Sequence, residues 1–442
     1  MKNLLLKHNY QWADNDFDTG IPRELLSQII VSLKAKHVIA ISGARRSGKS
    51  YLFRQTIREL LNRGISSNNI VQINFEDPFF VGKRDDTAII DELYSQYMAM
   101  KNPKEKVYLF LDEIQNIANW QFWVRDLYDR DHKKVKIFLT GSNSDLLSTE
   151  LATHLTGRVI SYENYPFTYR EYLQYQKTEI DLAPASGNTN AIYEHLYRDK
   201  EEIIHYLENS FSKGLFPEIA SLEDEELITE ILSQYFQNVI FSDIVPRFSI
   251  RNTKVIEELA YYLSTNFTSP YSYRKLAAAV GSNENTIKEY ISYFEKAYLF
   301  YSVDYFEYSL KKQFRRNRKI YSIDNGLRKA TSFSFSEEAG KYAENSVFLM
   351  LHRKYPSVYY WQDEHTNSEI DFVVSHKKKI YAINVTYTDD IHPRELEGFN
   401  AFSNVSKAVR NILITRNTFE TQEHKGVTIE LIPLWVFIFM EL

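Results

Sequence analysis

A glycine-rich stretch near the N-terminus has residue types and spacing that suit phosphate chemistry. Residues 43–50, GARRSGKS, fit the pattern G-x-x-x-x-G-K-[ST] and directly follow an apolar run at 38–41. Glycines at these positions let backbone N–H groups curl inward around phosphate oxygens, and the helix that begins there adds its positive dipole end. Lys49 would reach the β- and γ-phosphates, and Ser50 would bind Mg²⁺. The alternative is a Gly/Ser loop with an incidental lysine.

The same stretch defines a set of residues that we expect to contact a nucleoside triphosphate. They are Gly43, Ala44, Arg45, Arg46, Ser47, Gly48, Lys49, Ser50 and Tyr51, together with Arg23 from the segment that precedes the loop.

Two acidic residues end a later apolar run, at 107–111. Asp112 would hold Mg²⁺ through water, so Ser50 and Asp112 are the expected metal-binding residues. Glu113 would polarise the attacking water as a general base. An exposed acidic strand end is the other explanation of this pair.

Apolar runs suited to buried strands alternate with helical segments through the first part of the chain. Strands are expected at 38–41, 70–75, 107–111, 135–140 and 159–162, and helices at 22–33, 53–61 and from about 144 to 157. This alternation predicts an α/β fold with a doubly wound parallel sheet and a ligand at the carboxyl ends of the strands. Ser142 and Asn143 follow one strand, so either could contact the γ-phosphate or the lytic water; Asn143 is our catalytic candidate.

The order of these features resembles that of AAA+ (P-loop) ATPases. More closely, it resembles a prokaryotic AAA-type family with a C-terminal domain of uncharacterised function. The segments that carry the resemblance are GARRSGKS (43–50), LFLDEIQNIANWQFWVRDLYD (109–129), TGSNSDLLSTELATHLTGR (140–158) and PFTYREYL (166–173). The resemblance is strong in the first half of the chain and looser in the second. It implies that ATP and Mg²⁺ bind and that ATP is hydrolysed.

In AAA+ proteins an arginine just before the last sheet strand reaches the γ-phosphate held by a neighbouring subunit, and Arg158 occupies that position here. This catalytic role implies a homo-oligomer, either a ring or an open arc. Two local roles compete with it, because Arg158 could cap its own helix or pair with Glu163. Arg247 is a second and weaker candidate for a phosphate-sensing arginine.

Length and composition limit the class of protein. A chain of 442 residues exceeds one ordinary core, so we expect about two to four domains. The formal charge of −5 gives no global signal for nucleic acid, so such binding must use local patches. The chain has no cysteine, which excludes disulfides and thiolate-bound zinc. No apolar run is long enough to span a bilayer and the first ten residues do not fit a signal peptide, so we expect a cytoplasmic protein with no membrane contact.

Residues 251–310 favour a winged helix-turn-helix. A short helix at 273–280, a glycine-containing turn and a second helix at 286–297 precede an alternating segment at 298–303. Lys288 lies on the face that would meet DNA, although that face is only mildly polar and has glutamates nearby. Winged helices also act as protein-packing modules, and that alternative stays open.

The following segment, KKQFRRNRK at 311–319, places six cations in nine positions. Such a run is often a solvated loop. Coming after a winged helix, and with Phe314 inserted, it also suits the phosphate backbone of nucleic acid, with DNA as the first candidate. Binding of that kind weakens steeply with salt, because each neutralised phosphate releases counterions. The nucleic-acid-binding candidates are Lys311, Lys312, Arg315, Arg316, Arg318 and Lys288.

The C-terminal part resembles the restriction-endonuclease-like fold, in which a carboxylate on one strand and an E-x-K on the next bind metal and activate water. Strands are expected at 320–323, 358–361, 369–374 and 380–385. Glu344, Asp371 and the strand spacing match this arrangement. The expected E-x-K is replaced by Asn384, Val385 and Thr386, which removes one anionic ligand and the lysine and impairs two-metal hydrolysis. We therefore expect an inactive scaffold or DNA-docking module, with nuclease activity as the alternative.

Together these patterns predict Mg²⁺-dependent ATP hydrolysis coupled to a conformational change on nucleic acid. A slow nucleotide-controlled switch that acts on a protein partner is the alternative, followed by a nuclease. The expected domains are an N-terminal helical segment (1–35), an AAA+ ATPase domain (36–170), a helical lid or connector (171–250), a winged helix-turn-helix (251–310) and an endonuclease-like domain (311–442).

Overall fold

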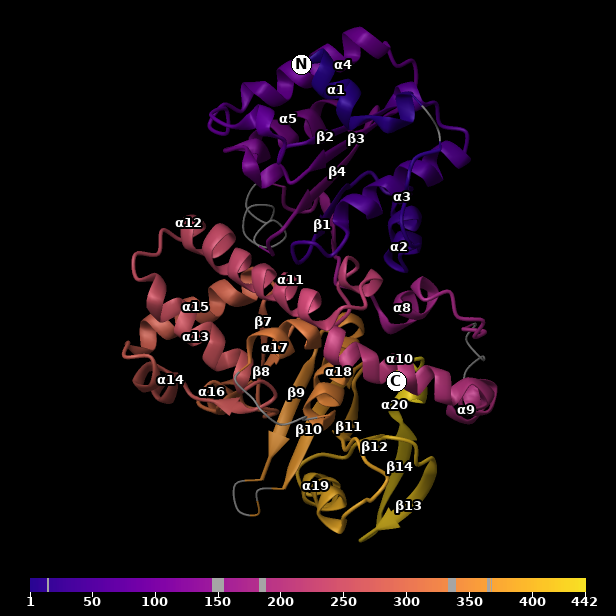
Figure 1. The fold of residues 1–442 in the computed structure, drawn as a ribbon, viewed down its shortest axis with the longest axis vertical. Coiled ribbons are helices and arrows are strands. Elements are labelled where there is room, and N and C mark those ends of the chain that lie inside the picture. The colour runs from indigo at the N-terminus through magenta and orange to yellow at the C-terminus, as the bar shows by residue number, and fades with distance from the viewer. Residues whose placement is uncertain (14–15, 145–154, 183–187, 333–338, 364–365, 367) are drawn as a thin grey trace. The chain divides into compact units, whose positions relative to one another are not determined.

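The computed structural model describes two compact units. The described residues are 1–13, 16–144, 155–182, 188–332, 339–363, 366 and 368–442. The first unit contains Met1–Phe167 and the short segment Lys296–Tyr298, and the second contains Thr168–Glu295 and Leu299–Leu442 (Figure 1). Most of the helix expected from about 144 to 157 lies outside the described residues.

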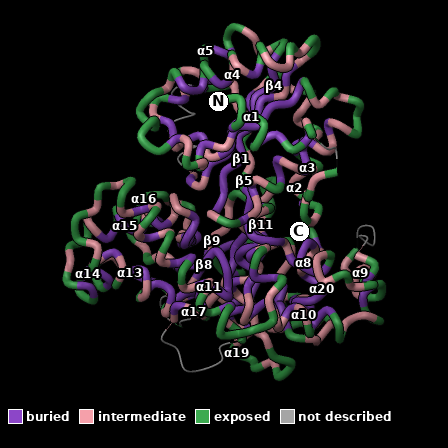
Figure 2. The backbone as a smooth tube through the Cα atoms, turned by 45° about the horizontal axis from the view of Figure 1, so that its top comes forward, coloured by how far each residue is buried: buried purple, intermediate pink, exposed green. Residues whose placement is uncertain are grey.

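A five-stranded parallel sheet forms the centre of the first unit. Its strands are β1 (Val38–Ser42), β2 (Ile70–Asn74), β3 (Val107–Asp112), β4 (Val135–Gly141) and β5 (Val159–Glu163), in the order β2-β3-β4-β1-β5. Strands β1 and β4 are buried along their whole length (Figure 2). Strands buried on both faces read as continuous apolar runs, which is why the sequence reveals them. The predicted α/β class with a parallel sheet is confirmed.

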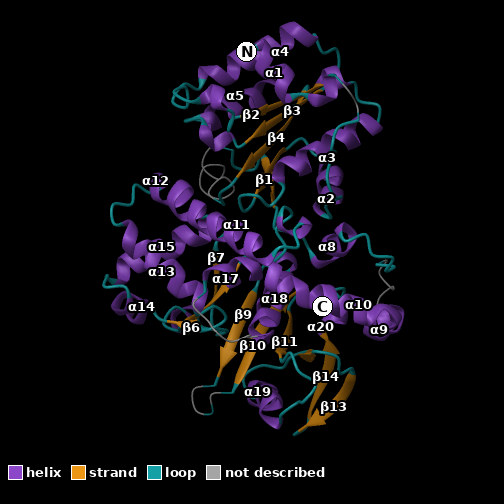
Figure 3. Ribbon diagram, in the orientation of Figure 1, coloured by secondary structure: helices purple, strands orange, loops and turns teal. Residues whose placement is uncertain are grey.

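Helices cover both faces of this sheet (Figure 3). They are α1 (Lys2–His8), α2 (Leu25–Ser32), α3 (Lys49–Asn62), α4 (Ala88–Lys101) and α5 (Trp120–Asp131). Because successive strand side chains point to opposite faces, Val38 and Ala40 of β1 pack in the core with α1, α4 and α5. Ile39 and Ile41 pack instead with α2 and α3. The carboxyl end of β1 therefore points directly into the loop that begins α3.

The second unit combines helices with two further sheets. Its helices are α8 (Tyr169–Tyr175), α9 (Thr189–Leu196), α10 (Lys200–Lys213), α11 (Glu225–Asn238), α12 (Val245–Arg247), α13 (Thr253–Thr265), α14 (Tyr273–Ala279), α15 (Glu284–Lys296), α16 (Leu310–Gln313), α17 (Asn325–Thr331), α18 (Ala339–Lys354), α19 (Pro393–Ser403) and α20 (Leu434–Phe437). No helix among the described residues is both long and apolar enough to cross a membrane.

The smaller sheet of the second unit has one strand before the helix pair α14–α15 in the chain and two strands after it. Its strands are β6 (Pro270–Tyr271), β7 (Phe300–Val303) and β8 (Arg318–Ser322), and β8 pairs antiparallel with both others. Gly281, with φ +62°, lies in the turn between α14 and α15. Buried Ile287, Ile291 and Phe294 line one face of α15, because residues three and four apart share a helix face.

The larger sheet has six strands. They are β9 (Val358–Gln362), β10 (Glu369–His376), β11 (Lys379–Val385), β12 (Arg410–Thr415), β13 (Glu420–His424) and β14 (Val427–Pro433), in the order β13-β14-β12-β11-β10-β9. The pairs β9–β10, β10–β11 and β13–β14 are antiparallel, whereas β11–β12 and β12–β14 are parallel. The sequence analysis anticipates β9, β10 and β11 but not the last three strands.

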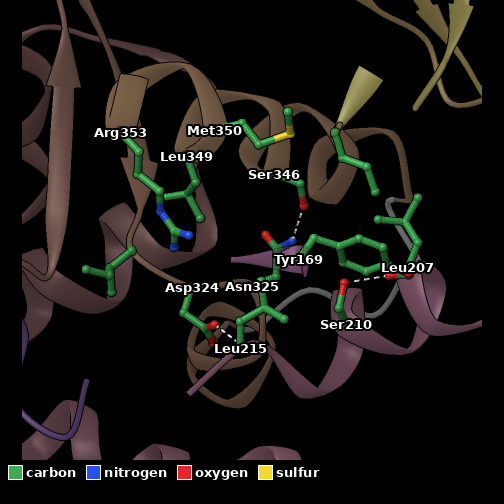
Figure 4. Close-up of a pocket in the computed structure, with 12 residues that line it drawn as sticks. Tyr169, Leu207, Ser210, Leu215, Asp324, Asn325, Ser346, Leu349, Met350 and Arg353 are labelled. Carbon is green, nitrogen blue, oxygen red and sulfur yellow. Dashed lines mark hydrogen bonds between the residues drawn. The ribbon is translucent and has the colours of Figure 1, made fainter. Parts of the chain in front are cut away.

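A buried carboxylate joins the end of α10 to the start of α17. Asp324 accepts a hydrogen bond from the backbone N–H of Leu215 at 2.6 Å (Figure 4). It accepts another from the backbone N–H of Leu327 at 2.9 Å. Gly214 has φ +78°, and a Cβ atom there would lie 2.0 Å from Asp324 Oδ1. Only glycine fits such an approach. The small cavity beside Asp324, about 40 Å³, has room for a few water molecules at most.

We predict that Gly214→Ala destabilises the second unit far more than Gly281→Ala. Both glycines have positive φ, but a Cβ atom at Gly281 meets nothing within 4 Å. The left-handed backbone alone costs an alanine about 1 kcal/mol, and the collision with the helix-capping carboxylate should bring the loss at Gly214 to about 3 kcal/mol. Urea unfolding followed by circular dichroism measures both. Equal losses would contradict the role assigned to Asp324.

Candidate active site

The loop between β1 and α3 wraps its backbone into a shape that suits an anion. Arg46 has φ +64° and Gly48 has φ +91°, so two residues of the loop adopt left-handed conformations. A Cβ atom on Gly43 would lie only 1.9 Å from the backbone oxygen of Asn164, which excludes every other residue type there. Successive amides in such a turn, at a helix N-terminus, form a concave binding site for phosphate.

Two side chains from outside the loop hold it in place. Asn164, directly after β5, donates from Nδ2 to the backbone oxygen of Ser47 at 2.8 Å and contacts Ser47 Oγ at 3.1 Å. Buried Arg23 donates to the same Ser47 oxygen at 2.7 Å and to the backbone oxygen of Tyr165 at 2.7 Å. Arg23 was predicted to contact the nucleotide, and the structure places its guanidinium against the loop's own carbonyl group. The sequence analysis missed Asn164, although its position at a strand end is a usable signal.

Lys49 lies at the centre of the site and is almost fully buried. Its Nζ donates to the backbone oxygens of Gly43 at 3.2 Å and Ala44 at 3.1 Å, and it lies 3.4 Å from Glu113 Oε1. Two loop carbonyls and one carboxylate thus satisfy the ammonium group. A bound triphosphate offers stronger anionic acceptors in the same place.

Asp112 supplies a buried carboxylate at the end of β3. Its Oδ1 accepts a hydrogen bond from Thr140 Oγ1, whereas Oδ2 has no hydrogen-bond partner among the described residues. Burial raises the pKa of Asp112 to about 6, and the charge of Glu113 adds to the rise. The hydroxyl groups of Thr140 and Ser50 lower this pKa in part.

These features fit a magnesium ion. An orphaned carboxylate oxygen beside a hydroxyl gives Mg²⁺ oxygen ligands, and Mg²⁺ usually takes only one or two carboxylates plus water and substrate phosphates. Within the described ranges, no group of three or more His, Cys, Asp or Glu side chains is arranged to hold a metal ion. Ser50 and Asp112 are the residues that would hold the ion.

Glu113 has a strained backbone and an ionised side chain. Its φ is +51°, and its N–H donates to Thr140 Oγ1 at 2.9 Å. Burial alone would raise the pKa of Glu113, but the charge of Lys49 and a hydrogen bond from Gln115 outweigh it and hold the pKa below its ordinary value. Gln115 donates from Nε2 to Glu113 Oε2 at 2.5 Å and to Ser142 Oγ at 3.3 Å. Residues with positive φ often mark functional sites.

The other residues predicted for the nucleotide site differ in how far their side chains are buried. Asn143 is buried at the end of β4, beside Ser142. Arg45 is half-exposed and pairs with Glu76 at 2.6 Å. Tyr51 is exposed, and its hydroxyl donates to Asp18 at 3.1 Å.

Arg158 is partly exposed and forms an ion pair within its own chain. Its Nε donates to Asp129 Oδ1 at 2.9 Å, and its guanidinium lies over the ring of Tyr128 at 5.9 Å. In the structure Arg158 therefore pairs with Asp129 of α5, a partner that the sequence analysis did not consider.

The predicted nucleic-acid-binding residues, in the second unit, fall into two groups. Lys311, Lys312, Arg315 and Lys288 are exposed. By contrast, Arg318 pairs with Asp304 at 2.7 Å and donates to the hydroxyl of Tyr273 at 2.7 Å. The guanidinium of Arg316 is half-buried and lies 4.9 Å from the centre of the Tyr305 ring.

Lys319, the last cation of this run, is buried among three carboxylates. Its Nζ lies 3.1 Å from both Glu344 Oε1 and Asp371 Oδ1 and also contacts Glu369. Burial raises the pKa of Glu344 to about 7 despite the nearby ammonium. The predicted pair Glu344 and Asp371 does come together, and β8 supplies a lysine to it. The ammonium group thereby offsets part of the buried negative charge.

Family models match most of the chain in three parts. Residues 35–173 match an AAA domain, and residues 204–338 and 339–437 match two domains of unknown function, DUF8612 and DUF4143. The parallel sheet, the phosphate loop and the paired carboxylates accordingly lie in an AAA domain that is similar to P-loop ATPases.

The chain also has relatives along nearly its whole length. The uncharacterized protein MJ1544 of Methanocaldococcus jannaschii is 31% identical over 92% of this chain and 89% of that protein. The chain belongs to the same protein family as MJ1544. An uncharacterized protein of Haemophilus influenzae is 29% identical over 94% of this chain and 98% of that protein. Among solved structures, PCH-2 of C. elegans aligns over 50% of this chain and 71% of its own, with 12% identity and a TM-score of 0.32.

We predict that Asp112→Asn stabilises the nucleotide-free protein at pH 8 but not at pH 4. A carboxyl whose folded pKa is raised contributes stability that is present below its unfolded pKa and is lost as the pH rises through its folded pKa. A rise from 3.8 to about 6 corresponds to about 3 kcal/mol lost between pH 4 and pH 7. The uncharged asparagine avoids this loss. Urea unfolding at several pH values measures the difference.

The exposed Asp85 provides the matched control, because Asp85→Asn should change stability little at either pH. A stability difference for Asp112→Asn that is the same at pH 4 and pH 8 would contradict the assigned ionisation.

Proposed function

We propose that the protein hydrolyses ATP with Mg²⁺ and that nucleotide state drives a conformational change that acts on nucleic acid. The observation that carries this proposal is the convergence of Lys49, Asp112 and Glu113 on one phosphate loop. Each supplies a different requirement of phosphoryl transfer: a cation for the phosphates, a metal ligand and a base.

The chemistry follows from the charges of the site. The ATP phosphates would lie against the loop amides and take Lys49 from its present acceptors. Release from Lys49 leaves Glu113 held by Gln115 and free to accept a proton from the attacking water. Ser50 and Asp112 would hold Mg²⁺, which would supply positive charge to neutralise the phosphates. Ser142 and Asn143, at the end of the adjacent strand, would contact the γ-phosphate or the water.

A short segment of the first unit would transmit a change at the nucleotide site to the residues that precede and follow it in the chain. Lys296–Tyr298 groups with this unit, although the residues on both sides of it in sequence belong to the second. The buried Tyr298 hydroxyl hydrogen-bonds Ser42 Oγ, directly before the phosphate loop, and donates to Glu163 at 3.3 Å. The N–H of Ser144 donates to the backbone oxygen of Lys296 at 3.0 Å.

This segment supports the coupling because it contacts residues beside both the loop and Asn143. The chain continues from it in one direction into α15 and in the other into β7. A shift at the γ-phosphate would therefore be transmitted along the chain to the helix pair α14–α15, which we propose as a DNA-facing winged helix. The exposed cations Lys311, Lys312 and Arg315 would bind the phosphate backbone.

We predict that Glu113→Gln lowers the kcat of ATP hydrolysis by at least about a hundredfold, because it removes the general base and leaves nucleotide binding in place. Phosphate release is measured with Mg-ATP, alone and with single-stranded or duplex DNA. The exposed Glu105 gives the matched control, and Glu105→Gln should hydrolyse ATP as the unmodified protein does.

Stimulation by DNA supports action on nucleic acid. Slow hydrolysis that no nucleic acid changes would favour the switch that acts on a protein partner. Absence of hydrolysis in every assembly form would contradict the proposal itself.

Because Arg158 pairs with Asp129, variants of the two residues can distinguish a catalytic role of Arg158 from a structural one. If Arg158 acts on the γ-phosphate of a neighbouring subunit, Arg158→Ala should lower kcat by about a thousandfold. Asp129→Asn, which breaks the same ion pair from the other side, should then change kcat only a few-fold, because exposed pairs contribute little stability.

Mixing Arg158→Ala with Glu113→Gln should restore part of the activity, since each variant supplies what the other lacks. The trans role is wrong if Asp129→Asn is as inactive as Arg158→Ala and mixing restores nothing.

A further inference from the structure

A groove of about 210 Å³ opens in the second unit, and aromatic side chains form much of its wall. The residues used in the argument are Tyr305, Phe306, Tyr308, Arg316, Trp361 and Asp363. Tyr305, Phe306 and Trp361 are buried and form a fixed floor. Phe306 and Trp361 each pack edge-on against Phe402 of α19, at 5.6 and 5.3 Å between ring centres.

Tyr308 is the exposed aromatic side chain at this groove. It is 72% exposed, yet its position is fixed, because its hydroxyl hydrogen-bonds Ser406 Oγ at 2.9 Å and its ring packs against Phe306 at 5.3 Å. A ring that is held at one end and presents its surface to water is suited to stacking on a planar ligand.

Helix α16 places positive charge beside this ring. Buried Gln313 donates from Nε2 to the backbone oxygen of Tyr305 at 2.8 Å, which anchors the helix to the floor of the groove. Lys311, Lys312 and Arg315 are exposed, and none has an ion-pair partner within the described part of the chain. The anchored helix therefore presents Lys311 and Lys312 as unneutralised cations, and Arg315 follows two residues after the helix ends.

The charges inside the groove differ from those on the helix. Glu307 and Asp363 contribute carboxylates to the lining, and the one guanidinium there, Arg316, already lies over the Tyr305 ring. Phosphate would be repelled from the interior but attracted to α16 outside it. A ligand with a planar neutral group for the groove and a chain of phosphates for the cations outside it would fit both parts of this surface.

We propose that this groove and α16 together bind single-stranded nucleic acid, with an unstacked base against Tyr308 and the phosphates along Lys311, Lys312 and Arg315. This inference rests on the proposed action on nucleic acid and specifies the form of strand. A duplex hides the faces of its bases, so it can use the cations of α16 but not the ring of Tyr308.

The test measures fluorescence anisotropy of labelled 20-nucleotide probes with the full chain. The probes are a single strand, the same sequence as a duplex and a single strand of abasic sugar-phosphate. The unmodified protein should bind the single strand more tightly than either of the other two probes. Tyr308→Ala should weaken single-strand binding about tenfold and leave the abasic probe unchanged, because base stacking alone is lost.

Three further variants test separately the aromatic ring, its position and the positive charge. Tyr308→Phe keeps the ring and should retain most of the affinity. Tyr262→Ala removes another partly exposed tyrosine of the second unit and should bind all probes normally. Lys311→Glu combined with Lys312→Glu should weaken every probe and reduce the dependence of affinity on salt.

The outcomes distinguish this inference from the function on which it rests. Duplex binding that equals or exceeds single-strand binding, or a Tyr308→Ala protein that binds the single strand normally, would overturn the groove assignment alone. If no probe binds while Mg-ATP is still hydrolysed, both the groove assignment and the proposed action on nucleic acid are overturned. The affinities of the unmodified protein for the three probes test the groove assignment even if a variant fails to fold.

Discussion

The phosphate loop depends on hydrogen bonds that come from outside it. Asn164 and Arg23 both donate to the backbone oxygen of Ser47, and Gly43 lies so close to Asn164 that no side chain fits. Left-handed backbone is unfavourable for most residues and persists only where surrounding contacts hold it. Without these hydrogen bonds, a loop with two left-handed residues would therefore sample other conformations. The last strand of the sheet and the segment before α2 thus fix the amides before any ligand arrives, and the catalytic residues are arranged around that fixed loop.

The buried charges beside the loop are only partly compensated by one another. Lys49 compensates Glu113, while Asp112 keeps an unsatisfied oxygen in a buried setting that raises its pKa. Burying a carboxylate without a partner is unfavourable, and such local conflicts are characteristic of functional sites. Binding of Mg²⁺ and a triphosphate would remove the conflict at Asp112 and give Lys49 new partners. Tyr298, which hydrogen-bonds both Ser42 and Glu163, lies in the short segment of this unit from which the chain continues into α15 and β7.

Local patterns in the sequence predict the loop, Asp112 and Glu113, because a buried strand and its terminal residues are contiguous. Partners that meet only through folding could not be found in this way, as Asp129, the partner of Arg158, shows. Lys319 is an intermediate case. It was grouped with surface cations because the strand was expected to begin at Ile320. Since β8 begins at Arg318, alternation places Lys319 and Tyr321 on one face, and both bind Glu344.

The central claim is that the loop accepts ATP and that its phosphates replace the present partners of Lys49. Titration calorimetry of Mg-ATP into the full chain tests this most directly, with Lys49→Ala and Arg45→Ala measured beside it. The account predicts saturable binding that Lys49→Ala abolishes and that Arg45→Ala, which alters a half-exposed pair with Glu76, largely retains. Absence of binding to the unmodified protein in every oligomeric form, or unchanged binding to Lys49→Ala, would contradict it.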